Sequence, residues 1–123
     1  MLPATSEIQR YYGAADVLVL PTPYDAFGMV ITEAMACGLP VITTPLAGAA
    51  ELLTDGVHGL LIQSPTDIAA LGTAMTSLAS NPEARARMGA AASALMREHT
   101  WDRVADRTLA VYYDHVARRQ AKH

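Results

Sequence analysis

The chain has 123 residues, of which 51% are hydrophobic and 17% charged, a balance that indicates a folded protein and excludes a disordered one. The net charge of −3 gives no sign of nucleic-acid binding. No apolar run approaches the roughly 20 residues that cross a bilayer, and the single cysteine, Cys37, has no partner for a disulfide, so we expect a soluble, cytoplasmic protein.

Helix and strand patterns alternate in the first part of the chain. Residues 5–14 favour a short helix, with Ser6 and Gln9 at the spacing of a capping box. Residues 17–20 are a continuous apolar run that Pro21 closes, as expected for a strand that is buried on both faces.

The middle of the chain continues this alternation. Residues 28–37 are predicted to form an apolar helix, which a glycine and a proline end. Residues 41–44 and 59–62 supply two further strands, with a brief helix at 49–53 between them. Strands that alternate with helices predict a parallel sheet with crossover helices. The expected fold is therefore α/β, a partial doubly wound, Rossmann-like sheet of about three strands with flanking helices.

The remainder is predicted to be helical. One helix follows Thr66 or Asp67, either of which could cap it, and Asn81-Pro82 opens a second with Pro in the favoured first position. Thr100 can cap a last helix. The apolar stripe of that last helix consists of Trp101, Val104, Ala105, Leu109, Tyr112 and Val116.

The stretch PTPYDAFGMVITEAMACGLPVITT holds the strongest functional signal. Asp25 and Glu33 are carboxylates separated by seven residues, and the helix that carries Glu33 begins at Phe27-Gly28. A helix that starts at a glycine offers free backbone N–H groups and the positive end of its dipole to an anion. Ionised carboxylates accept hydrogen bonds from hydroxyls and repel phosphates. The arrangement suits a ligand with a central anion and hydroxyls on both sides, and a nucleotide-sugar is such a ligand.

The run AADVLVLPTPYDAFGMVITEAMACGLPVITT and the later DGVHGLLI resemble the donor-binding C-terminal domain of GT-B retaining glycosyltransferases of the glycosyltransferase 4 (group 1) family. That family has a Glu, seven intervening residues and a second Glu, with FG in between and EAMACGxPVI after it. The resemblance covers roughly residues 12–66 and implies that residues 1–123 form a single domain, the C-terminal portion of a GT-B donor-binding domain. Asp25 departs from the Glu of most members, and Ala47-Gly48 from the two glycines of many.

The resemblance implies a transferase that moves a sugar from a nucleotide-diphosphate-sugar donor to an acceptor with retention of anomeric configuration. The helix at 28–37 would hold the diphosphate, Glu33 the ribose hydroxyls and Asp25 the transferred sugar, which makes these two carboxylates the candidate catalytic residues. No metal and no further cofactor is implied. The implied donor-binding residues are Phe27, Gly28, Met29, Val30 and Glu33.

Positive charge is missing from this stretch, since no Lys or Arg occurs between Arg10 and Arg85. A departing nucleoside diphosphate needs cationic or strongly polarising groups, and in the resembled family an Arg and a Lys precede the point that corresponds to Met1. We therefore expect a fragment, inactive alone, that lacks upstream strands and an N-terminal acceptor domain; a peripheral membrane contact of the parent stays open. Residues 17–20 would then be an uncovered sheet edge through which the fragment self-associates.

Other interpretations of the same residues stay open. Asp25 could end the Pro-Tyr-Asp turn or cap the helix, Gly28 could be a plain helix-start glycine, and Glu33 could be an exposed helix glutamate. A glycosidase pair of acids is disfavoured, because the neighbouring residues resemble a transferase. The rival functions are a non-catalytic α/β binding or assembly module and a GT-B-fold nucleotide-sugar epimerase.

Overall fold

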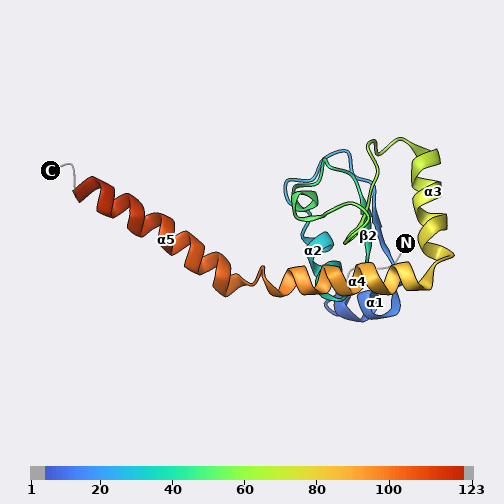
Figure 1. Ribbon diagram of the computed structural model, residues 1–123, viewed down its shortest axis with the longest axis horizontal. Coiled ribbons are helices and arrows are strands. Elements are labelled where there is room, and N and C mark those ends of the chain that lie inside the picture. The colour runs from blue at the N-terminus through green and yellow to red at the C-terminus, as the bar shows by residue number, and fades with distance from the viewer. Residues whose placement is uncertain (1–4, 121–123) are drawn as a thin grey trace.

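The computed structural model describes residues 5–120 (Figure 1). Its elements in chain order are α1 (Ile8–Ala14), β1 (Leu18–Leu20), α2 (Met29–Ala36), β2 (Val41–Thr43), the 3-10 helix η1 (Gly48–Leu52), β3 (Gly59–Leu61), α3 (Ile68–Ala79), α4 (Pro82–Arg97) and α5 (Trp101–Gln120).

The three strands form one parallel sheet in the order β1-β2-β3. Leu18 pairs with Val41, and Val41 in turn pairs with Gly59. The segments between the strands carry α2 and η1, so each connection crosses over the sheet as the alternating pattern predicts. The predicted α/β class and the three parallel strands are confirmed.

Two apolar cores lie on opposite faces of the sheet, because side chains alternate along each strand. On one face Val41 packs with residues of α1, α2 and η1, among them Ile31 and Met35. On the other face Ile42 packs with Leu78 of α3. Helix α4 runs along one end of the sheet (Figure 1) and contributes Met88 to the second core and Ala92 and Met96 to the first. Helices thus cover both faces, as in a doubly wound fold.

The helix starts agree with the sequence prediction at α3 and α4 and differ at α1. The Asp67 carboxylate accepts a hydrogen bond from the Ala70 N–H, so Asp67, not Thr66, caps α3. Asn81 caps α4, with Pro82 as its first residue. The predicted capping box at α1 is wrong, because α1 begins at Ile8 after Glu7 and no side chain of residues 5–120 caps it.

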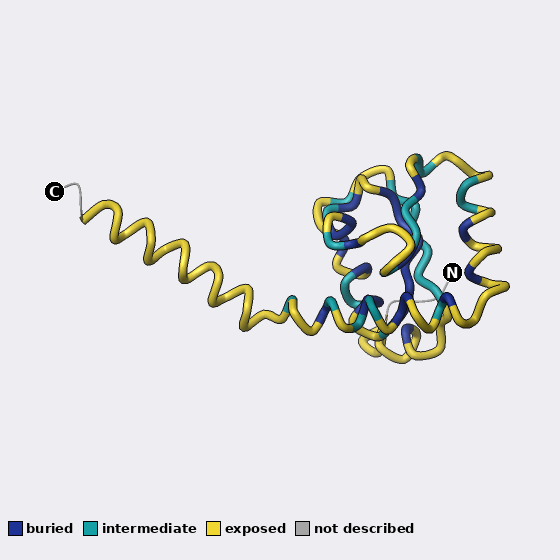
Figure 2. The backbone as a smooth tube through the Cα atoms, in the orientation of Figure 1, coloured by how far each residue is buried: buried dark blue, intermediate teal, exposed yellow. Residues whose placement is uncertain are grey.

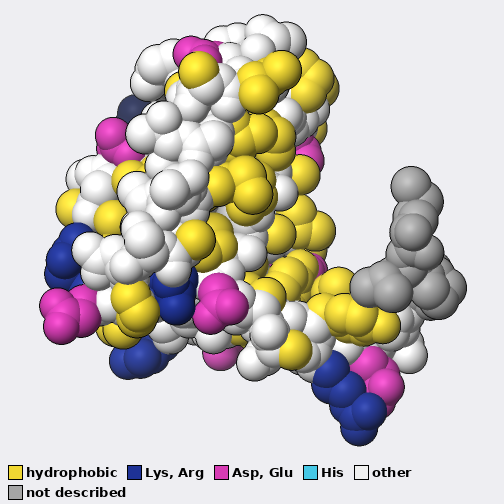
Figure 3. Space-filling model, turned by 90° about the vertical axis from the view of Figure 1, so that its right-hand side faces the viewer, with side chains coloured by type: hydrophobic (Ala, Val, Ile, Leu, Met, Phe, Trp, Pro, Cys, Tyr) yellow, Lys and Arg dark blue, Asp and Glu magenta, His cyan; other side chains and the backbone are white. Residues whose placement is uncertain are grey.

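Strand β1 lies at one edge of the sheet within the described residues, as predicted. Hydrophobic side chains gather in a band on the side of the molecule where α3 lies (Figure 3). A hollow of about 360 Å³ opens between this edge and α3, and Val17, Val19 and Met75 line it. Self-association through this edge stays a prediction.

Helix α5 forms as predicted, but its apolar stripe is not buried. The helix projects away from the body (Figure 1), and every residue of it is exposed along its whole length (Figure 2). Trp101 is 80% exposed and Tyr112 is 65% exposed. Helical periodicity predicted the element correctly, but a stripe of apolar residues does not by itself specify what covers it. None of the described helices, this 20-residue one included, has the length and apolarity to cross a bilayer.

Candidate functional site

A left-handed glycine sets the start of α2. Gly28 has φ +84° and ψ 59°, the left-handed region that residues with a Cβ adopt only at a cost. A Cβ at Gly28 would also lie 3.1 Å from the Cδ1 atom of Ile31. Just before it, the Asp25 Oδ1 atom accepts a hydrogen bond from the Phe27 N–H at 3.1 Å. The turn from Asp25 to Gly28 reverses the chain direction after β1 and sets the direction in which α2 begins.

The loop before α2 is fixed by the segment that leads into η1. The Gly48 N–H donates to the Asp25 carbonyl at 3.0 Å, and the Ala49 N–H donates to the Phe27 carbonyl. Gly48 comes so close to Ala26 that a Cβ there would overlap the Ala26 carbonyl oxygen. A residue other than glycine at position 48 would therefore push the two loops apart, and the α2 start would move with them.

The first turn of α2 carries free hydrogen-bond donors. No hydrogen bond from the backbone N–H of Gly28, Met29 or Val30 is present among residues 5–120, and no side chain caps the helix. Phe27 and Met29, 47% and 55% exposed, leave this end open to solvent, although Gly28 itself is buried. Free N–H groups at the positive end of a helix dipole favour an anionic group.

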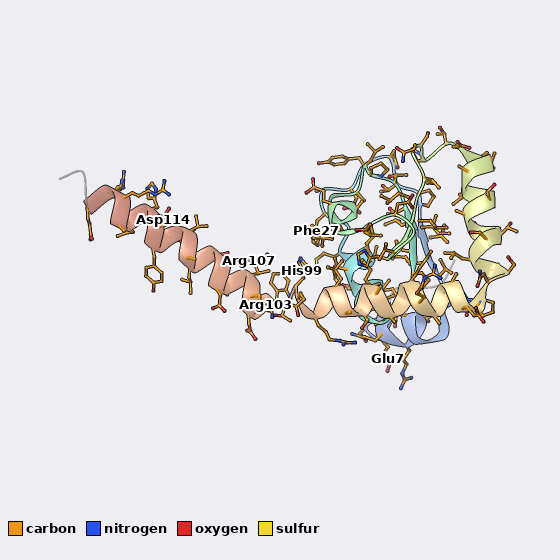
Figure 4. The ribbon with its side chains drawn as sticks, in the orientation of Figure 1. Glu7, Phe27, His99, Arg103, Arg107 and Asp114 are labelled. Atoms are coloured by element: carbon orange, nitrogen blue, oxygen red, sulfur yellow. The ribbon has the colours of Figure 1, made fainter. Side chains whose placement is uncertain are left out.

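A cavity of about 650 Å³ lies along the exposed side of α2. Met29 and Glu33 stand one helical turn apart on this side, and Phe27 also lines the cavity. The opposite wall comes from the junction of α4 and α5, which supplies Met96, His99 and Trp101. Phe27 and His99 therefore lie near each other at the end of the body from which α5 leaves (Figure 4). The wall is mostly apolar, and Glu33 is its one carboxylate.

The Glu33 carboxylate is anchored from α1. The Tyr12 hydroxyl donates a hydrogen bond to Oε2 of Glu33 at 2.9 Å, across a sequence separation of 21 residues. The pKa of Tyr12 is raised from 10.0 to about 12, chiefly by burial and further by the hydrogen bond to Glu33 and the negative charges of Glu33 and Cys37. The phenol therefore stays protonated at neutral pH and acts as a donor to Glu33.

The structure brings some of the predicted site residues together and not others. Phe27, Met29 and Glu33 border the same cavity. Asp25, Gly28 and Val30 do not border it, although the Asp25 carboxylate lies next to Gly28 at the α2 start. The turn role that the sequence left open for Asp25 is present, whereas a side-chain cap on α2 is absent. The roles of these residues toward a ligand stay predictions.

Sequence reasoning missed two parts of the site. Tyr12 is one, because nothing within α1 marks a hydrogen-bond partner 21 residues away. His99 and Trp101 come from the end of the chain, and only the position of α4 across the sheet brings them beside α2. Within residues 5–120 the structure has no group of three His, Cys, Asp or Glu side chains that could hold a metal ion.

Comparison with known protein families and curated proteins gives a consistent picture. The family model for glycosyl transferases group 1 matches residues 1–94. The chain is 38% identical over 107 residues to a D-inositol 3-phosphate glycosyltransferase of Thermomonospora curvata, a match that covers 85% of this chain and 24% of the relative. A protein of the same name from Streptomyces griseus is 38% identical over 117 residues, covering 92% of this chain and 25% of the relative. The chain thus spans about a quarter of the length of these relatives.

Solved structures share the fold. A sucrose-phosphate synthase from Thermosynechococcus elongatus superposes with a TM-score of 0.78 at 32% identity, covering 87% of this chain and 27% of the other. Anabaena HepE, solved in complex with UDP-glucose, has a TM-score of 0.78 at 26% identity, covering 92% of this chain and 31% of its own. These neighbours are GT-B glycosyltransferases, so the predicted GT-B architecture, of which this chain covers a part, is confirmed.

Proposed function

Because the chain belongs to the group 1 glycosyl transferases, we propose that it supplies part of the donor site of an enzyme that transfers a sugar from a nucleotide-diphosphate-sugar to an acceptor, with retention of anomeric configuration. The observation that carries this proposal is the set of free N–H groups at the α2 start, next to a cavity that Met29 of this first turn borders together with the Glu33 carboxylate one turn further along. A structural neighbour solved with UDP-glucose supports it.

The diphosphate binds at the start of α2. The N–H groups of Gly28, Met29 and Val30 donate to its oxygens, and the helix dipole adds about 0.3–1 kcal/mol in an exposed setting. Gly28 matters here because glycine adopts the left-handed conformation without strain, and that conformation sets the direction of the first turn of α2.

The two carboxylates bind hydroxyls on either side of the diphosphate. Glu33 borders the cavity and accepts hydrogen bonds from the ribose hydroxyls. Asp25 uses Oδ1 in its turn with Phe27, while its Oδ2 atom has no hydrogen-bond partner within residues 5–120 and is free for the transferred sugar. Both carboxylates repel phosphate, so the donor binds in one orientation, with its ribose at Glu33 and its sugar at Asp25.

The transfer exchanges one bond for another at the anomeric carbon. The bond to the diphosphate oxygen breaks, the acceptor oxygen forms its bond on the same face of the sugar, and the acceptor proton leaves with the departing diphosphate. The protein's contribution is to position the reactants and to stabilise charge on the leaving oxygens. The N–H groups of α2 supply part of that stabilisation.

Cations for the leaving group do not come from the donor segment, because no Lys or Arg occurs between Arg10 and Arg85. We propose that they come from another part of a longer protein, together with the acceptor site, and that residues 1–123 are a single donor-binding unit without turnover of its own. The same absence of cations favours, as a second candidate, a module that binds the nucleotide-sugar without reacting. A nucleotide-sugar epimerase would use the same site and release a free sugar or an isomer, not a glycoside.

Donor binding by the 123-residue chain tests the proposal. Calorimetric or NMR titrations with UDP-glucose, UDP and GDP-mannose are compared for the wild type, Glu33→Ala and Asp25→Ala. Asp106→Ala, an exposed residue of α5, is the matched control. We expect weak, millimolar-range binding that Glu33→Ala reduces and Asp106→Ala does not change. Glu33→Ala binding equal to that of the wild type would contradict the ribose role. Retention is then read from the anomeric configuration of the glycoside that the complete gene product forms.

A further inference from the structure

The hydrogen bond from the Tyr12 hydroxyl to Glu33 has no role in the proposed function. The Tyr12 side chain is 7% exposed and belongs to the core between α1, α2 and the sheet. Its hydroxyl points out of that core to the Glu33 carboxylate, which lies half-buried at the cavity wall. The ring is therefore fixed by apolar packing, while its polar tip reaches the candidate ligand-binding group.

We propose that Tyr12 is a positioning residue for Glu33, which holds one carboxylate oxygen so that the other faces the ribose hydroxyls of a nucleotide. This inference rests on the proposed function. The hydroxyl of Tyr12 occupies Oε2 of Glu33, and Oε1 is left for the ligand. Tyr12 itself touches neither the cavity nor the ligand.

The geometry fits this role because glutamate on a helix is otherwise a mobile side chain. Ordering a glutamate costs up to about 1.5–2 kcal/mol of rotamer entropy, and a group that is already fixed before the ligand arrives does not bear that cost on binding. A hydrogen bond to an ionised group is also stronger than one between neutral groups. The anchor comes from a ring that the core holds, so it is more rigid than the side chain it orients.

The Tyr12 hydroxyl is an uncharged donor, and this affects the charge of Glu33. Lys or Arg at this position would form an ion pair with Glu33 and reduce the negative charge available to ligand hydroxyls. Tyrosine donates one hydrogen bond and leaves the carboxylate negative. Its raised pKa, about 12, means that it remains a donor across the physiological range.

A purely structural tyrosine would also pack in this core, so the test removes the hydroxyl and keeps the ring. Tyr12→Phe preserves the apolar packing. Tyr11→Phe is the matched control, because Tyr11 is the neighbouring residue, is 42% exposed and makes no side-chain hydrogen bond within residues 5–120. The probes are UDP and 2′-deoxy-UDP, which differ in one ribose hydroxyl, and the dissociation constants come from NMR titration of the 123-residue chain.

We expect Tyr12→Phe to weaken UDP binding about three- to tenfold and to reduce the preference for UDP over 2′-deoxy-UDP, while Tyr11→Phe changes neither. In a Glu33→Ala background, Tyr12→Phe should cause no further loss, because the hydroxyl acts only through Glu33. A loss that is undiminished in that background would overturn the positioning role.

The outcomes separate this inference from the proposed function. If Glu33→Ala weakens UDP binding but Tyr12→Phe binds as the wild type does, the positioning role is wrong and the proposed function stands. If the wild type binds no UDP at several millimolar, or if Glu33→Ala has no effect, the ribose role of Glu33 is wrong and the positioning role fails with it.

Discussion

Replacement of Gly28 by alanine tests the geometry of the α2 start. Gly28 has φ +84°, and a Cβ there would lie 3.1 Å from the Ile31 Cδ1 atom. The left-handed conformation costs a non-glycine residue about 1–2 kcal/mol. Alanine also lowers the entropy of the unfolded chain, which returns about 0.4–1 kcal/mol. Because Cδ1 is the flexible end of a side chain, the close contact adds little. We expect the free energy of unfolding to fall by about 0–1.6 kcal/mol.

A second glycine, Gly72, provides a control for which we expect a change in the free energy of unfolding of the opposite sign. Gly72 lies inside α3 on its exposed side, and a Cβ there would meet nothing within 4 Å. Gly72→Ala should therefore raise the free energy of unfolding by about 0.5–1 kcal/mol. Urea unfolding followed by far-UV circular dichroism measures both variants. If Gly28→Ala raised the free energy of unfolding as much as Gly72→Ala does, the left-handed start of α2 would be refuted.

Three further predictions address other features of the site. Gly48→Ala should lower the free energy of unfolding by about 1–3 kcal/mol, because its Cβ would overlap the Ala26 carbonyl oxygen; an unchanged urea midpoint would contradict the contact. Because the folded-state pKa of Tyr12 is raised to about 12, its contribution to stability is complete below pH 10 and is lost as the pH rises from about 10 to about 12. Tyr12→Phe should remove that part of the pH dependence, and Glu33→Ala should lower the phenol pKa in an absorbance titration. Finally, the open β1 edge should lead to self-association, and a clean monomer at micromolar concentration in sedimentation velocity would argue against it.

The sequence predicted the sheet because its strands carry their own signals. The apolar runs around Leu18, Val41 and Leu60 are short, β-branched or leucine-rich and bounded by Pro and Gly, which leaves little choice of element or of direction. The caps at Asp67 and Asn81 were equally local and were found.

Features that depend on distant parts of the chain could not be predicted in the same way. The bond between Tyr12 and Glu33 requires α1 and α2 to pack on the same face of the sheet, which no local pattern states. The cavity wall at Trp101 depends on the direction in which α4 leaves the sheet. The stripe on α5 has the right period, yet none of it is buried within residues 5–120, because periodicity identifies an apolar side and not its partner.

The central claim is that a diphosphate binds at the first turn of α2. Amide chemical-shift mapping of the ¹⁵N-labelled chain during a titration with UDP-glucose tests it most directly. We predict that the amides of Gly28, Met29 and Val30 shift most, because their N–H groups are the free donors at the positive end of the helix. Shifts that cluster on α3 or α5 while these three amides stay unmoved at saturation would contradict the account.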